Sequence, residues 1–440
     1  MSNKRHLNYR DRNASTDKDS FSFGSTSKLK FISRFMENFN AMRRYLLIPF
    51  LLVLVSFGLE ANDSSFSASG GQLVPAVETE ISVQKEVLTL KRNGDRLRVD
   101  VYYEFYNPTS SKKELIVGFV TPAPYNGDCD PKDLFVEQPC ISGFRVEMNG
   151  FYLNHKVALV EQSIYDDVKR EWVKLDVFKD GSPNALPKHV IDGYVKEMES
   201  GQLEYLSFDY VYYFDALFVP GVNVVKHTYE YELSNSVDHI FSFPYELTPA
   251  CRWANGQVDD FTLIVDMGDF ATFSIPGTFF NETDQWTIHG VGRQMFDRGH
   301  CGYYKGETQR DFWIRNGYIE FKKKNFKPEG ELYIYRSLSF LCTEASDVIN
   351  SVLYGGYHEL DIDSEYGFGD GIISAEQARI LKNLPFAYRG HVFQSKDLQE
   401  VFNKAPWYIP TPSYVPNTSS LTEGERRWVN YWANYKPKVQ

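Results

Sequence analysis

Residues 97–105 alternate without a break between apolar and polar side chains, and this pattern constrains the fold more than any other feature of the chain. The apolar members are Leu97, Val99, Val101, Tyr103 and Phe105, and the polar members are Arg98, Asp100, Tyr102 and Glu104. Successive side chains of a β-strand point to opposite faces, so a period of two gathers the apolar ones on one face. The pattern predicts a strand with one buried face and one open face.

Three Asn-Gly pairs accompany runs of this kind, at 93–94, 149–150 and 316–317. Both residues tolerate positive φ, which makes Asn-Gly the strongest short signal for a tight hairpin. We therefore expect a hairpin at each pair. Repeated short strands with such turns predict a mainly β fold, with an antiparallel β-sandwich body over residues 62–345, either one large sandwich or two packed together. Residues 189–200 interrupt this pattern with apolar side chains at helical spacing, and we expect a helix there.

A short apolar run near the N-terminus indicates export. Arg43 and Arg44 precede an apolar stretch at 45–59, and Ala61 follows it. This is the layout of a secretory signal peptide, and the run is short of the ~20 residues of a transmembrane helix. We expect residues 42–61 to be cleaved and no permanent membrane span to remain.

Residues 1–41 are polar and aperiodic, which is typical of disorder. Two explanations stay open for them. Translation starts near Met42 and they are not native, or they form an unusually long region before the apolar run.

Charge is unevenly distributed along the chain. Residues 62–371 carry 28 Lys/Arg and 48 Asp/Glu, whereas residues 372–440 carry nine and five. An acidic body argues against nucleic acid or an anionic membrane surface as the main partner.

Five cysteines fit an exported protein. Cys129 and Cys140 flank a short loop-like stretch and are candidates for one disulfide, and Cys251 and Cys301 are candidates for another. Connectivity cannot be deduced from sequence, and Cys342 is left over. The absence of a C-x-x-C motif leaves thioredoxin-like chemistry and zinc ribbons without support.

No catalytic or cofactor motif stands out. The sequence lacks the G-x-S-x-G nucleophile elbow, the G-x-x-x-x-G-K phosphate loop and the H-E-x-x-H zinc motif. His227 lies on an apolar face, where a core histidine is the more common interpretation than a ligand. The acidic stretch 346–370 lacks the oxygen ligands of an EF-hand loop and is expected to be a linker. We therefore expect no cofactor and no metal.

The C-terminal residues 371–440 predict a small helical module. Ser374 with Gln377 and Thr422 with Glu425 are capping boxes, and Ser395 is a candidate cap between them. We expect Pro385 to end the first helix. The aromatic side chains are expected to pack the core of this module, with a ligand platform as the alternative; they are Phe386, Phe393, Phe402, Trp407 and Tyr408.

The stretch "NLPFAYRGHVFQSKDLQEVFNKAPWYIP", followed by "LTEGERRW", is similar to the YARHG domain, a small extracellular bacterial module. The resemblance covers about 60 residues and implies export and attachment to other envelope domains, without implying a reaction. The signature itself departs, since Phe386, Tyr388 and Arg389 stand where the family has tyrosine, arginine and histidine. If the basic pair of the family binds a ligand, Arg389 and His391 are its replacements here, with Trp407 and Tyr408 as aromatic neighbours.

The body also resembles secreted β-domains of unknown function, through "VYYEFYNPTSSKKELIVGFVTPAP" and "DALFVPGVNVVKHTYEYELSNS". This likeness implies fold and compartment only. Together these observations predict an exported, periplasmic or extracellular protein without enzymatic activity. We expect it to bind or scaffold a cell-wall polymer, another envelope polymer or an envelope protein. The alternative is a hydrolase of envelope polymers that uses a carboxylate pair in the β body, although no pair is singled out.

Overall fold

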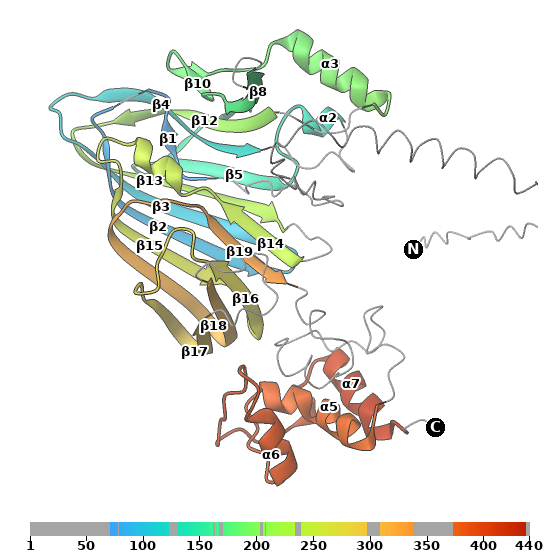
Figure 1. Ribbon diagram of the computed structural model, residues 1–440. Coiled ribbons are helices and arrows are strands. Elements are labelled where there is room, and N and C mark those ends of the chain that lie inside the picture. The colour runs from blue at the N-terminus through green and yellow to red at the C-terminus, as the bar shows by residue number, and fades with distance from the viewer. Residues whose placement is uncertain are drawn as a thin grey trace, which may run out of the picture. The chain divides into compact units, whose positions relative to one another are not determined.

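The computed structural model describes ten ranges of the chain, shown in Figure 1: 71–77, 79–122, 131–161, 163–166, 170–202, 206, 208–233, 239–296, 309–337 and 373–436. All of them belong to the compact unit Asn62–Gln440. The expected leader at 1–41, signal peptide at 42–61 and acidic linker at 346–370 lie outside the described residues. Within the described ranges, no helix has the length and apolar character needed to cross a bilayer.

One large sheet organises the body. Its strands follow the order β14-β19-β16-β18-β15-β2-β3-β13-β5-β6, and β17 pairs with β18 beside this path. Their bounds are β2 Ser82–Asn93, β3 Arg96–Asn107, β5 Ile141–Met148, β6 Phe151–Leu153, β13 Gly221–Glu232, β14 His239–Tyr245, β15 Val258–Asp266, β16 Ala271–Pro276, β17 Trp286–Phe296, β18 Gln309–Phe326 and β19 Leu332–Ser337. The pairs are antiparallel except for β2 with β15, which run parallel.

The alternation at 97–105 is confirmed as the core strand β3. All five of its apolar side chains are buried, and the polar ones between them face outward. The hairpin between β2 and β3 turns at Gly94, whose φ is 66°, and the hairpin between β5 and β6 turns at Asn149 and Gly150, with φ of 52° and 88°. Two of the three expected Asn-Gly hairpins are therefore present.

The third expected hairpin, at Asn316-Gly317, is wrong. Strand β18 runs straight through both residues. Gly317 pairs directly with Gly290 of β17, and the register shifts at the next position, between Val291 and Gly292. A Cβ on Gly317 would lie 1.9 Å from the His289 carbonyl oxygen, so the two backbones approach too closely for a side chain. The glycine permits a close approach of two strands beside a β-bulge and does not form a turn.

A second sheet covers part of the large one. It has the order β1-β4-β12-β7, with β1 Val74–Pro75, β4 Lys113–Pro122, β7 Lys156–Glu161 and β12 Phe208–Phe218. Aromatic rings pack between the two sheets. The ring centre of Phe119 in β4 lies 5.5 Å from that of Tyr229 in β13, and the ring centre of Tyr212 in β12 lies 5.2 Å from that of Phe144 in β5. The facing sheets and their shared core make a β-sandwich.

At the end of the large sheet formed by β14 and β19, the sheet folds back over its own central strands. Phe243 of β14 lies 5.8 Å from Tyr231 of β13, although these strands are far apart in the sheet order. Figure 1 shows β14 and β19 lying across the central strands. The other strands form two hairpins, β8 Ser163–Asp166 with β9 Glu171–Lys174 and β10 Phe178–Lys179 with β11 Ser182–Pro183. The helices of the body are α2 Pro131–Leu134, α3 Lys188–Glu199 and the 3-10 helix η1 Thr248–Arg252, and α3 confirms the helix expected at 189–200.

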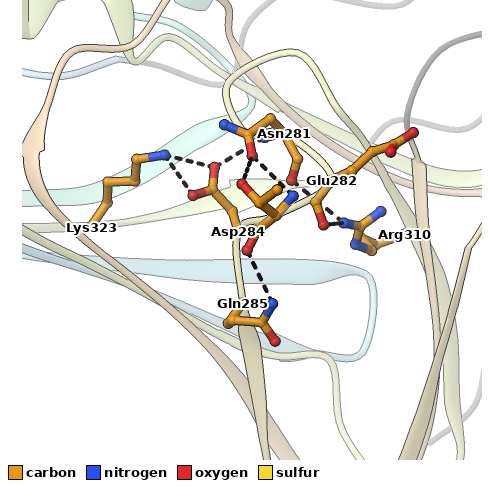
Figure 2. A network of polar contacts seen from close by, with 7 residues as sticks. Asn281, Glu282, Asp284, Gln285, Arg310 and Lys323 are labelled. Carbon is orange, nitrogen blue, oxygen red and sulfur yellow. Dashed lines mark hydrogen bonds and ion pairs between the residues drawn. The ribbon is translucent and has the colours of Figure 1, made fainter.

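The loop between β16 and β17 is held by charged side chains (Figure 2). Lys323 of β18 donates to both carboxylate oxygens of Asp284, at 2.6 and 2.7 Å. The fully buried Arg310 donates to the Glu282 carbonyl at 3.0 Å and lies over the Phe280 ring. Lys323 thus points to the core side of β18, while its neighbours in the strand point to the other face.

The two proposed disulfides stay predictions. Cys129 and Cys301 lie outside the described residues, so neither pair is tested. Cys140 is half-buried against the core, and its amide donates to Gln138 Oε1. Cys251 is also half-buried, with its sulfur 3.9 Å from the Pro328 carbonyl oxygen.

The C-terminal module contains the helices α5 Ala375–Tyr388, α6 Lys396–Phe402 and α7 Glu423–Asn434. Both capping boxes are confirmed, at Ser374 with Gln377 and at Thr422 with Glu425. The mainly β body with a small helical C-terminal module is the fold class that the sequence predicts.

The expectation that Pro385 ends α5 is wrong, since the helix continues to Tyr388. Proline has no N–H, so Pro385 leaves the carbonyl of Leu381 without its intrahelical donor. The indole N–H of Trp428 in α7 donates to that oxygen at 2.7 Å. A side chain from another helix thereby satisfies the group that the proline orphans, and the helix continues.

We predict that Trp428→Phe lowers the free energy of unfolding by about 1–3 kcal/mol, because it removes this donor and leaves a buried carbonyl unsatisfied. In a Pro385→Ala background the alanine N–H returns to Leu381, and the same substitution should cost less. Urea unfolding followed by helical circular dichroism measures both costs. Equal costs in the two backgrounds would show that the indole acts through packing alone.

Candidate functional site

Arg389, the first sequence-predicted binding residue, is engaged within the protein. Its guanidinium makes two hydrogen bonds to the Glu425 carboxylate, at 2.7 and 2.8 Å, and a third to the Pro385 carbonyl. Its side chain is 13% exposed and that of Glu425 only 1%. The Arg389 guanidinium also lies 5.0 Å from the ring centre of Phe270. The capping carboxylate of α7 therefore doubles as the partner of this arginine.

The two aromatic candidates are core residues. Trp407 and Tyr408 are buried, and Trp407 packs against Tyr388 with ring centres 4.4 Å apart. The Tyr408 hydroxyl donates to the backbone carbonyl of His391 at 2.7 Å. His391 itself is partly exposed, and burial of its ring lowers its pKa. The four residues lie near one another, and ligand binding by them stays a prediction.

The module contacts the body through cations of two neighbouring strands. Arg315 of β18 donates to Thr411 Oγ1 at 2.7 Å and to the Ile409 carbonyl, and Arg293 of β17 donates to the Pro406 carbonyl at 3.1 Å. Trp313 of β18 belongs to the apolar cluster of the module. Gly390 permits this approach, since a Cβ there would lie 2.8 Å from the Arg315 guanidinium.

We predict that Arg389→Ala destabilises the protein by about 3–5 kcal/mol, because it leaves the Glu425 carboxylate buried without its cation. Arg379→Ala is the matched control. It breaks an ion pair with Asp397 in which both side chains are nearly half exposed, and it should change stability by less than about 1 kcal/mol. Thermal unfolding compares the two. If Arg389→Ala is as mild as its control, Arg389 is available for a ligand.

The open face of the large sheet carries a second candidate site. Two hollows of about 350 and 430 Å³ lie on this face and share Val87 in their lining. We call them together the outer trough. The residues whose side chains face it are Lys85, Val87, Thr89, Arg98, Asp100, Tyr102, Arg145, Glu147, Tyr152, Lys226, Thr228, Asp260, Thr262, Glu320, Lys322 and Lys324.

Strand register explains the shape of the trough. Pairing aligns one row of side chains across seven strands, from β6 to β18. In order the row reads Tyr152, Glu147, Lys226, Tyr102, Val87, Thr262 and Lys322. The short Val87 and Thr262 side chains lie between long ones, and the adjacent row has Thr228 and Thr89 in its interior. Short side chains flanked by long ones leave the hollows.

Most charges in the trough neutralise one another. Arg98 pairs with Asp100 at 2.7 Å, Lys324 with Asp260 at 2.8 Å and Lys322 with Glu320 at 2.9 Å. Looser pairs join Lys226 to Glu147 and Lys85 to Glu104. Arg145 is exposed, and it forms no ion pair or hydrogen bond with any residue that the structure describes.

The sequence predicts the open face of the large sheet from the alternation of one strand only, at residues 97–105. The polar positions of 97–105 predict an open face, but the other residues of that face come from strands far away in the sequence, such as β13 and β18. Only the register brings the threonines and cations of different strands together.

Two ionisable groups with strongly shifted pKa values, Glu86 and His227, have their side chains in the core and not in the trough. Burial raises the pKa of Glu86 to about 8, and the Gln72 amide donates to its carboxyl group. Burial lowers the pKa of His227 to about 3. His227 stacks on Tyr103, and neither ring nitrogen has a hydrogen-bond partner in the described part of the chain. It is a core histidine, as its sequence context indicates, but an unsatisfied one.

We predict that the stability of the protein is greatest between about pH 4.5 and 6.5. Glu86 holds its proton more tightly when folded, so its contribution is full below pH 4.5 and is lost as pH rises to about 8. His227 holds its proton less tightly when folded, so its contribution is full above pH 6.5 and is lost as pH falls to about 3. Each group changes the folding equilibrium constant about tenfold per pH unit between its unfolded-state and folded-state pKa values. Between pH 4.5 and 6.5 the two contributions change in opposite directions and cancel.

Urea unfolding from pH 4 to 9 measures this profile. Glu86→Gln should flatten the alkaline side, and His227→Phe should make the acid side shallower. A profile that neither substitution changes would show that these groups do not set it.

Two family models match parts of this chain. The family described as the YARHG domain matches residues 372–436, and the family described as a domain of unknown function, DUF4424, matches residues 61–247. No curated protein matches the chain. One similar solved structure is the crystal structure of a Legionella pneumophila protein described as a candidate for nutrient binding. It is 16% identical, covers 84% of this chain and 100% of that chain, and has a TM-score of 0.41.

Both resemblances drawn from the sequence are thereby confirmed. Residues 372–436 of this chain are a YARHG domain, and residues 61–247 are a DUF4424 domain.

Proposed function

We propose that this is an exported, non-enzymatic protein of the bacterial cell envelope that binds an envelope polymer or another envelope protein. Export is supported by the signal-peptide layout at 42–61 and by the YARHG domain, a module of exported proteins. A cleaved signal peptide would leave no permanent membrane span.

The outer trough is the observation that carries a binding role. It presents hydroxyl groups, charged pairs and aromatic rings on the rigid face of a sheet whose opposite face is the core. Binding sites typically combine a concave surface with a few fixed polar groups. The strands hold these side chains in place, so little ordering would be needed when a ligand binds.

The locations of the ionisable groups favour binding over hydrolysis. Strongly shifted pKa values mark catalytic groups when they occur in a cleft. Here the strong shifts belong to core groups such as Glu86, His227 and Tyr103, which are buried, whereas the carboxylates of the trough are paired with cations. A general acid for glycoside hydrolysis needs a raised pKa at a place that a substrate can reach.

A cosedimentation assay with purified sacculi tests the proposal, using the protein as its host processes it. We expect the protein to pellet with the sacculi and to release no soluble sugar fragments or reducing ends. Protein recovered from the envelope fraction should begin near Asn62, which mass spectrometry of the N-terminal peptide determines.

Two results would contradict the proposal. Release of fragments without stable retention would favour the envelope hydrolase with a carboxylate pair. Recovery of the uncleaved chain from the cytosol would remove the envelope role.

A further inference from the structure

We propose that the outer trough binds an extended glycan that carries carboxylate groups, and that Arg145 receives one of these groups. This inference rests on the proposed binding role and names the ligand class of the same site. It follows from the length of the trough, from the groups that line it and from Arg145, the one cation of the trough that has no carboxylate partner among the described residues.

The dimensions of the trough favour an extended ligand. The row from Tyr152 to Lys322 crosses seven neighbouring strands. With about 4.8 Å between strands, the row spans roughly 29 Å. A compact metabolite would fill only a small part of this length, whereas a linear polymer could follow all of it.

The sheet face favours a glycan over a peptide. The backbone N–H and C=O groups of these strands are already used in the sheet, so the face offers side chains only. An extended peptide gains most of its affinity from main-chain hydrogen bonds and therefore binds at a sheet edge. Hydroxyl groups can both donate and accept, and those of Thr89, Thr228 and Thr262 match the hydroxyl groups of a sugar polymer.

Aromatic rings add flat apolar surfaces along the same row. Tyr152 lies at the edge strand β6 and is 76% exposed. Tyr102 lies three strands further along, and its hydroxyl is fixed by a hydrogen bond to Glu104 at 2.9 Å. Exposed rings with a polar tip suit ligands that are apolar on one face and polar at the rim.

The charge balance selects a sparsely anionic ligand. Six Lys and Arg side chains and four Asp and Glu side chains face the trough, which makes it basic within an acidic body. All of these cations except Arg145 are paired with carboxylates of the same face. Nucleic acids and polyphosphates gain affinity from many free cations. A single planar guanidinium fits a carboxylate through two parallel hydrogen bonds.

Isothermal titration of the full chain with a galacturonic acid hexamer tests the inference. The same hexamer as its methyl ester is the matched neutral ligand, and linear polyphosphate is the dense polyanion. We expect the acid to bind, and the ester and the polyphosphate to bind at least tenfold more weakly.

Three variants separate the trough from general charge. Arg145→Gln should weaken binding of the hexamer at least tenfold. Lys404→Gln removes one charge from the exposed surface of the helical module and should change nothing. Val87→Lys adds a cation but fills the centre of the trough, so it should weaken binding, whereas simple charge attraction would strengthen it. Unchanged melting temperatures verify that the variants are folded.

The inference is overturned if the ester or polyphosphate binds as tightly as the acid. It is also overturned if Arg145→Gln leaves the affinity unchanged, if Val87→Lys raises it, or if the hexamer does not bind. In each case retention on sacculi would leave the broader binding role standing. Loss of retention by the unsubstituted protein would remove that role instead.

Discussion

The two-residue period of the strands is the constraint on which the rest of this structure depends. Each side chain of β2, β3 and β13 lies either in the aromatic core or on the open face. A register shift of one residue would place Arg98 in the core and Leu97 in water. The hydrophobic effect therefore fixes the register, and the register fixes which polar side chains become neighbours on the open face. Core packing therefore also determines which side chains line the outer trough.

Polar groups inside this protein show how exceptions to simple sequence rules are accommodated. Pro385 breaks the hydrogen-bond ladder of α5, but the indole of Trp428 takes the place of the missing donor. Glu86 lies in the core with an amide partner, whereas the ring nitrogens of His227 have no hydrogen-bond partner among the residues that the structure describes. In both ionisable groups burial favours the neutral form, so the core avoids carrying a charge.

In the helical module, the residues that the sequence offered as ligand-binding candidates make internal contacts. Arg389 links the cap of α7 to the end of α5 and contacts Phe270 of the body. Trp407 and Tyr408 belong to the core of this small module, whose stability depends on the burial of large apolar side chains. The basic and aromatic cluster of the module therefore has a structural role. The side chains on the open face of the sheet lie outside the core, so packing constrains them less.

Local patterns in the amino-acid sequence were enough to predict the class of fold, the core strand at 97–105, the helix at 189–200 and both capping boxes, because periodicity and capping depend on neighbours along the chain. The two families were identified from longer sequence motifs. It also predicted a hairpin at Asn316-Gly317 and a helix end at Pro385, and both predictions are wrong. In each case the deciding partner, Gly290 or Trp428, lies in another element and cannot be identified from local rules. The outer trough, the ion pair of Arg389 with Glu425 and the solvent-free surroundings of His227 were decided by tertiary structure alone. Strand register and helix packing bring together residues that are far apart in the sequence, and local sequence patterns do not predict such contacts.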